Sequence, residues 1–202
     1  GGTPERAAAA AQAAIEDGAE IILGPLFAPM ATAVGPIAHA KGVPVIAFSS
    51  DRSVGGNGVY LLSFQPENEV RRIVTYAARE GHSAFAALVP DTAYGKVVEG
   101  AFSQSVAGAG GAVTTVQTFP EQPQAVGAAA RAAAGSGADA ILIAAGGVPL
   151  QAIGPTLVLS GANGRNVKFL GTGLWDDPAT TREPTLQGGW FAAPDPQPWR
   201  AF

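Results

Sequence analysis

The stretch GAEIILGPLFAPMATAVGPIAHAKGVPVIAFSSD, residues 18–51, determines the fold class of this chain. Residues 21–23 and 43–48 are short, almost wholly apolar runs bounded by Gly and Pro, which is typical of strands covered on both faces. The segment between them predicts a helix, so the two strands form a parallel crossover unit. Ligands of open parallel sheets collect beyond the carboxyl ends of the strands, and the second run ends at the polar residues Ser49, Ser50 and Asp51.

Composition narrows the function classes. A chain of 202 residues with 47% hydrophobic residues can bury a real core. The charged fraction is 14% and the net charge is -4, so no basic face offers the phosphate neutralisation that a nucleic-acid partner requires. The chain has no cysteine, which excludes thiolate catalysis, thiolate metal sites and disulfides.

The alternation of helix and strand continues along the whole chain. Thr3 and Pro4 are the cap and first position of an Ala-rich helix that Gly18 ends. Further strands are predicted for residues 59–64, 84–89, 112–119, 138–144, 167–170 and 186–192, and helices for residues 66–80, 96–107, 125–134 and 149–160, the last kinked or split at Pro155. This order predicts an α/β chain with mostly parallel sheets and helices on both faces.

The chain divides into two lobes where this rhythm breaks. A Gly-rich turn at residues 55–58 and a strand without a following crossover helix interrupt the alternation of helices and strands, which resumes regularly after them. We therefore predict that residues 1–64 belong to a first lobe, residues 65–194 form a second lobe, and residues 195–202 begin a return segment to the first lobe. The first lobe has only three strands and two helices, so we expect it to be incomplete in this chain.

Residues 18–50, together with VPDTAYGKVVEGAF at residues 89–102, resemble the type I periplasmic solute-binding proteins in their Leu/Ile/Val-binding branch. The resemblance covers nearly the whole chain. It implies two lobes that close like a hinge on a small polar, amino-acid-like solute, a periplasmic location, no cofactor, and membrane transporter subunits as partners. Family members also carry further first-lobe elements, which implies a fragment or a lobe completed by another copy.

The resemblance implies candidate ligand-binding residues on each lobe. Ser49 and Ser50 lie where the family contacts its ligand, although the two hydroxyls can equally well hydrogen-bond their own loop. Tyr94, in the DTAYG loop, matches the family's aromatic residue of the second lobe, and its alternative interpretation is a packing residue at the start of a helix. The family's carboxylate-binding hydroxyl position is Ala28 here, which leaves the amides that open the next helix, among them those of Met30 and Thr32, as anion donors. The alternative interpretation is an ordinary helix start.

A second anchor is also altered. In amino-acid binders of this family, an acidic side chain that binds the ligand ammonium stands at about the position of Gly173. Asp176 is the nearby carboxylate, and Trp175 is an aromatic residue able to line the cleft. Their alternative interpretation is a solvated Asp-Asp-Pro turn with Trp175 packed beneath it. The resemblance therefore implies solute binding with weakened amino-acid anchors.

Residues 48–81 are similar to those of a different branch, the lipoprotein activators of penicillin-binding proteins. This alternative implies a peptidoglycan synthase as the partner, action by protein–protein contact, and a lipid anchor in the full-length protein.

The sequence shows no catalytic or metal-binding apparatus. The glycines of GAGGAV, residues 108–113, join a helix to the start of a strand, the opposite end from a dinucleotide site. His39 and His82 stand alone in the sequence, without a carboxylate or second His at metal or triad spacing. Ser49, Ser50 and Asp51 lack a nucleophile elbow. We expect a binding protein and not an enzyme.

Overall fold

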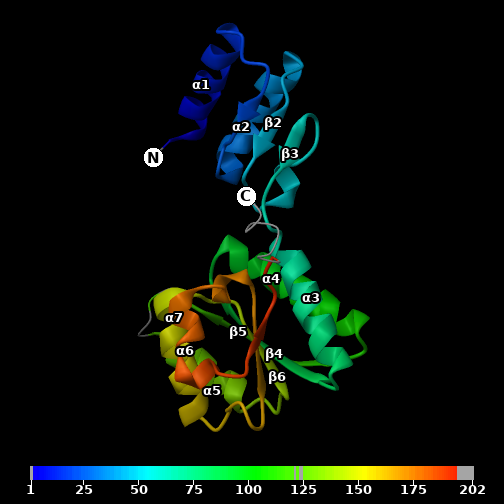
Figure 1. Ribbon diagram of the computed structural model, residues 1–202, viewed down its shortest axis with the longest axis vertical. Coiled ribbons are helices and arrows are strands. Elements are labelled where there is room, and N and C mark those ends of the chain that lie inside the picture. Colours follow the sequence, from blue (N-terminus) through cyan, green and yellow to red (C-terminus); the bar gives the residue numbers. More distant parts are fainter. Residues whose placement is uncertain (1, 121, 123–124, 195–202) are drawn as a thin grey trace. The chain divides into compact units, whose positions relative to one another are not determined.

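The computed structural model (Figure 1) describes residues 2–120, 122 and 125–194. The chain forms two compact units, Gly1–Gln65 and Pro66–Phe202. Among the described residues, no helix has the length and apolar character needed to cross a membrane.

The first unit is a three-stranded parallel sheet with two helices. Its elements are α1 (Pro4–Glu16), β1 (Ile22–Leu23), α2 (Ala28–Ala40), β2 (Val45–Ala47), a 3-10 turn η1 (Arg52–Val54) and β3 (Val59–Leu61), with strand order β1-β2-β3. The predicted cap is present, since the Arg6 amide donates to Thr3 Oγ1 at 3.4 Å. Gly and Pro at the strand ends keep the strands short, as the sequence predicts.

One face of this sheet is buried and the other is open. Val45, Ala47 and Val59 pack against small and branched residues of α1 and α2. On the opposite face, three paired residues lie side by side across the strands: Leu23 is paired with Ile46, and Ile46 with Tyr60. Leu23 is 72% exposed and Tyr60 is 61% exposed. Among the described residues, helices therefore cover only one face of the first sheet.

The second unit is a larger, doubly covered sheet. Its elements are α3 (Pro66–Arg79), β4 (Ala84–Pro90), α4 (Ala93–Gly108), β5 (Ala112–Phe119), α5 (Gly127–Ala134), β6 (Ala140–Ile143), α6 (Gly147–Leu159), β7 (Lys168–Gly171), the 3-10 turn η3 (Gly173–Trp175), α7 (Pro178–Thr181), the 3-10 turn η4 (Pro184–Leu186) and β8 (Trp190–Phe191). All neighbouring strands are parallel, in the order β5-β4-β6-β7-β8.

Helices cover both faces of this second sheet (Figure 1). On one face, α3 and α4 bury residues such as Val70 and Phe102 against Phe85 and Leu142. On the other, α5 and α6 bury residues such as Ala130 and Ile153 against Ile141 and Phe169. Continuous apolar runs such as β6, with all four residues buried, are what a sheet covered on both faces requires.

The structure confirms the α/β class with parallel sheets, and it corrects two details. The segment predicted to split at Pro155 is one helix, α6, with Pro155 inside it, because the apolar face of its second half still packs on the core through Leu157. The strand predicted for residues 186–192 shrinks to Trp190–Phe191, because η4 takes up its beginning. The return segment predicted for residues 195–202 lies outside the described residues.

Candidate functional site

The DTAYG loop joins β4 to α4 at the carboxyl edge of the second sheet. Thr92 caps the helix, because its Oγ1 accepts the Gly95 amide at 3.2 Å. A Cβ at Gly95 would collide with the carbonyl oxygen of Pro90, so only glycine lets the helix start this close to the strand end. In the DTAYG motif, the backbone at Gly95 therefore lies directly against the backbone of Pro90. This close contact fixes the position of Tyr94 at the start of α4.

Tyr94 projects from the first turn of α4 toward the end of β7. Its hydroxyl lies 3.0 Å from Oγ1 of Thr172, a residue with no exposed surface. Burial raises the pKa of the Tyr94 phenol, the hydrogen bond with Thr172 opposes that shift, and the nearby Glu69 carboxylate adds to it. Tyr94 is therefore a neutral phenol held between two elements, with its ring partly buried against the α3 and α4 core.

Glu69, in the first turn of α3, reaches the same place from another direction. Its Oε2 accepts the backbone amide of Gly173 at 3.0 Å. A Cβ built on Gly173 would lie 2.7 Å from Glu69 Oε1, so the carboxylate occupies the space where a side chain at position 173 would begin. Burial raises the pKa of the Glu69 carboxyl, and the amide of Gly173 opposes that shift.

Sequence reasoning missed Glu69. A glutamate in the first turn of a helix has an ordinary explanation, since it complements the helix dipole. Its contact with Gly173 spans 104 residues of sequence. The absence of an acid at Gly173 was visible in the sequence, but the carboxylate that lies against Gly173 comes from a distant helix.

A cavity of about 360 Å³ lies at this carboxyl edge. Strand ends and helix starts of the second unit line it, and its largest side chains are Tyr94, Phe119, Pro149 and Leu174. The remaining lining residues are Pro90, Thr92 and three alanine or glycine residues, and no charged side chain is among them. Such a lining suits the apolar body of a small solute, with polar recognition left to the rim.

The serines of the first unit are divided between two environments. Ser49 is 3% exposed, and its Oγ accepts the Asp51 amide at 3.1 Å. Its carbonyl accepts the hydroxyl of Ser63 at 2.7 Å, so Ser49 serves its own loop. Ser50 is exposed beside it. Ligand contact by Ser49 and Ser50 stays a prediction, with Ser50 the more accessible of the two.

The start of α2 does not offer the free amides that the sequence predicted. The amides of Met30 and Ala31 both donate to the Phe27 carbonyl at 3.1 Å, because the helix begins at Ala28 and Phe27 is its cap. The Thr32 hydroxyl donates to the Ala28 carbonyl at 3.0 Å. Thr32 lines a separate hollow of about 320 Å³ between α2 and the 53–59 segment. Met30 and Thr32 therefore lack the predicted anion-binding arrangement.

Trp175 is a core residue in this structure, as in the second of the two interpretations that the sequence left open. It is 2% exposed, and its indole N–H donates to the Ile143 carbonyl at 3.2 Å. A Cβ at Gly171 would collide with its ring. Burial of a large ring with its one donor satisfied explains the position. Asp176, next to it, is exposed at the end of η3.

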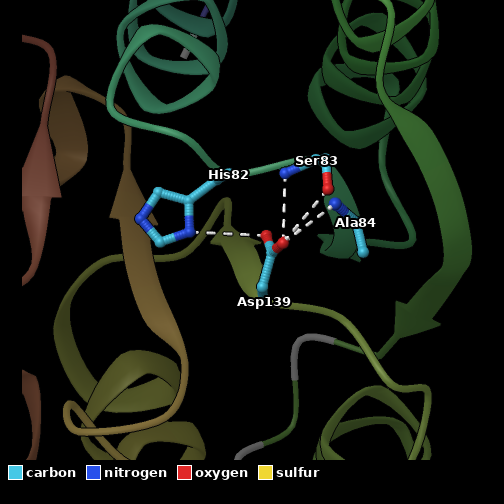
Figure 2. Close-up of polar contacts among 4 residues, drawn as sticks. All are labelled: His82, Ser83, Ala84 and Asp139. Atoms are coloured by element: carbon cyan, nitrogen blue, oxygen red, sulfur yellow. Dashed lines mark hydrogen bonds and ion pairs between the residues drawn. The ribbon is translucent and has the colours of Figure 1, made fainter.

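The sequence suggested that His82 is isolated, but in the structure it has a carboxylate neighbour. Figure 2 shows Asp139 beside it, with His82 Nδ1 3.4 Å from Asp139 Oδ1. The other carboxylate oxygen accepts the amides of Ser83 and Ala84 at 3.1 and 3.2 Å. His82 and Ser83 precede β4, Ala84 is its first residue, and Asp139 precedes β6, so the cluster lies at the amino edge of the sheet, away from Tyr94. It ties two strand beginnings together.

Two further observations concern other kinds of site. Within the part of the chain that the structure describes, no three His, Asp or Glu side chains are grouped so as to hold a metal ion. A larger hollow of about 980 Å³ lies between α3 and β8, lined by Arg71, Arg72, Arg79 and Trp190. None of the predicted site residues lines it. Tyr94, whose hydroxyl lies beside Thr172, does line the cavity of about 360 Å³, and this favours that cavity as the candidate site.

Comparisons with known proteins agree with this fold. The family described as periplasmic binding protein matches residues 1–201. No curated protein matches the chain.

Several solved structures are similar to the chain. A solute binding protein of an ABC transporter from R. palustris, in complex with 4-hydroxybenzoate, has 24% identity and a TM-score of 0.69, with 89% of this chain and 51% of that one covered. A leucine binding protein from Thermotoga maritima has 21% identity and a TM-score of 0.72, with 96% and 57% covered. An extracellular ligand-binding receptor from Rhodopseudomonas palustris has 18% identity and a TM-score of 0.73, with 98% and 59% covered. The chain thus spans little more than half the length of these relatives.

Proposed function

We propose that this chain, which belongs to the periplasmic binding protein family, is part of a non-enzymatic receptor that binds a small solute at the carboxyl edge of its second sheet. The observation that carries the proposal is the cavity of about 360 Å³ lined by Tyr94, whose hydroxyl lies beside Thr172. Ligands of open parallel sheets collect at this edge.

The chemistry of the cavity supports a solute with an apolar body. Tyr94, Phe119 and Leu174 supply apolar surface, and the hydroxyls of Thr92 and Tyr94 supply orientation. Solved relatives bind 4-hydroxybenzoate in one case and are named for leucine in another, so the fold accommodates both aromatic and aliphatic solutes. Hinge closure on the solute, delivery to membrane transporter subunits and a periplasmic location are parts of the proposal that rest on family membership.

The test is calorimetric titration of the intact protein with a panel of branched-chain amino acids and aromatic acids. We expect at least one to bind, and Tyr94→Ala to weaken that binding by about tenfold or more, because it removes both ring contact and hydroxyl. Tyr76→Ala is the matched control, since Tyr76 lies on α3, 46% exposed, and packs edge-on against Trp190. Heat from no solute in the panel, or equal losses in both variants, contradicts the proposal.

A second candidate function is activation of a peptidoglycan synthase by surface contact. It is favoured by two observations, the lack of any charged side chain in the cavity lining and alanine at position 28. An activator should capture the synthase equally well with and without Tyr94→Ala. Loss of capture in that variant would set this candidate aside.

A further inference from the structure

The chain has two Asn-Gly pairs, one at Asn57 and Gly58 in the first unit and one at Asn163 and Gly164 in the second. In such a pair, the backbone nitrogen of the glycine can attack the side-chain amide of the asparagine, because glycine has no side chain to hinder the approach. The two pairs are therefore equivalent in sequence. The structure separates them, because their surroundings hold the two asparagines to different degrees.

Asn57 and Gly58 form the two-residue loop of a tight hairpin. Gly56 and Val59, on either side, form an antiparallel bridge in which each amide donates to the other residue's carbonyl at 2.9 Å. Both loop residues have positive φ, 47° for Asn57 and 84° for Gly58. This is the type I′ turn that Asn-Gly sequences favour. The bonds that close the turn therefore belong to the neighbours of Asn57.

Asn57 itself is held weakly. Among residues 2–120, 122 and 125–194, no hydrogen bond restrains Asn57 or the amide nitrogen of Gly58. Asn57 is exposed, so water reaches its side-chain amide. Rotation of the Asn57 backbone toward the geometry of attack opens only the two bonds of the turn, and such local opening costs far less than global unfolding.

Asn163, by contrast, is held by four hydrogen bonds. Its amide donates to Asn166 Oδ1 at 2.8 Å, and its Oδ1 accepts the amide of Arg165 at 3.0 Å. Its backbone carbonyl accepts the amides of Asn166 and Val167 at 3.0 and 2.9 Å. Attack by Gly164 has to break several of these bonds at once, and each broken hydrogen bond slows the step severalfold.

We propose that Asn57 is a site of spontaneous deamidation and that the fold protects Asn163 from the same reaction. The Gly58 nitrogen loses its proton and bonds to Cγ of Asn57, and the side-chain nitrogen takes up a proton and leaves as ammonia. Water then opens the cyclic imide at one of its two carbonyls. One opening gives an aspartate, and the other gives an isoaspartate, whose backbone is one methylene longer. This inference goes beyond the proposed function, because it concerns the first unit and not the solute cavity.

The two products have different consequences for the first unit. An aspartate at position 57 keeps the turn, because Asp-Gly also favours type I′. The isoaspartate lengthens the loop, so the bridge between Gly56 and Val59 no longer closes in register. Val59 is 6% exposed and packs closely on α2, where a Cβ at Gly35 would lie 3.0 Å from its Cγ2. Isoaspartate formation should therefore loosen β3.

The experiment is incubation of the intact protein at mildly alkaline pH, with peptide mapping by mass spectrometry at intervals. The mass gain of an amide that becomes a carboxyl identifies the modified peptides, and chromatography separates aspartate from isoaspartate. We expect the Asn57 peptide to convert at least about tenfold faster than the Asn163 peptide, as two or more additional broken hydrogen bonds imply. In urea, where the fold is lost, the two peptides should convert at similar rates.

Asn57→Gly is the matched variant, because Gly-Gly also suits the turn but has no side-chain amide. It should keep the fold and form no isoaspartate in this peptide. Equal rates at the two pairs in the folded protein, or faster conversion at Asn163, would overturn the proposal. So would an Asn57 that stays intact in the folded protein over the time in which both pairs convert in urea, because the turn would then protect it. A difference in rate that persists unchanged in urea would show that the fold is not its cause, which overturns the proposal as well.

Discussion

The two units of this chain are built from the same pattern of parallel strands and helices, yet their sheets are covered to different extents. In Pro66–Phe202, β6 is buried at every residue, with one helical layer on each face of the sheet. In Gly1–Gln65, the described helices cover one face, and Leu23 and Tyr60 stand 72% and 61% exposed on the other. Parallel sheets are stable when both faces are covered, so we expect the second unit to be stable on its own.

The largest effect expected from this difference concerns the isolated units. A fragment of residues 66–202 should unfold cooperatively, because both faces of its sheet are already buried. A fragment of residues 1–65 should show little cooperative structure, because one face of a short three-stranded sheet is open. Circular dichroism during thermal denaturation measures both. A sharp transition for residues 1–65 and none for residues 66–202 would show that coverage of the sheet does not set the stability of the units.

The close approach at Gly95 should give the next largest effect. Gly95→Ala places a Cβ against the Pro90 carbonyl, which no rotamer change relieves, and we expect it to lower the free energy of unfolding by about 3 kcal/mol or more.

The matched control is Gly100→Ala on the same helix, where a Cβ meets nothing within 4 Å. Because alanine is the better helix former, this change should be neutral or should stabilise by up to about 1 kcal/mol. Chemical denaturation of both variants measures the difference. Equal effects at the two positions would mean that the strand end and helix start are not held as tightly as the structure shows.

At the opposite edge of the same sheet, Asp139→Ala should cost about 1–3 kcal/mol in the free energy of unfolding. The change leaves the amides of Ser83 and Ala84 without their carboxylate acceptor and removes the partner of His82 (Figure 2). Solute affinity should stay unchanged, because this edge is remote from Tyr94. Loss of affinity without loss of stability would move the functional site to this edge.

These variants also show how far the sequence alone reaches. Local features were predictable, because Thr3 and Pro4 start a helix and apolar runs between Gly and Pro form strands by short-range chemistry. The placement of Glu69 against Gly173, and of Asp139 against His82, was not. Both contacts depend on the strand order β5-β4-β6-β7-β8, which the alternation of elements leaves open. The choice between the two interpretations of Trp175 stayed open for a related reason, since its burial depends on the missing side chain at Gly171.

The smallest predicted effect is on the pH dependence of stability. Because burial raises the pKa of Glu69 above its ordinary value of 4.5, the folded protein holds this proton more tightly than the unfolded chain. The free energy of unfolding should therefore fall as the pH rises from about 4.5 through the raised pKa. Glu69→Gln removes this group, so the variant should gain stability relative to the wild type across that window. A difference between the two proteins that is independent of pH would contradict the burial of this carboxyl.

Hydrogen exchange of the intact protein, with and without a solute found by calorimetry, locates the binding site on the sheet. We predict new protection in the loops at the carboxyl edge of the second sheet, residues 90–95, 144–149 and 172–174, and no change at residues 82–84 and 139. Protection that appears at the amino edge or along the hollow between α3 and β8, with the carboxyl edge unchanged, would contradict a solute site beside Tyr94.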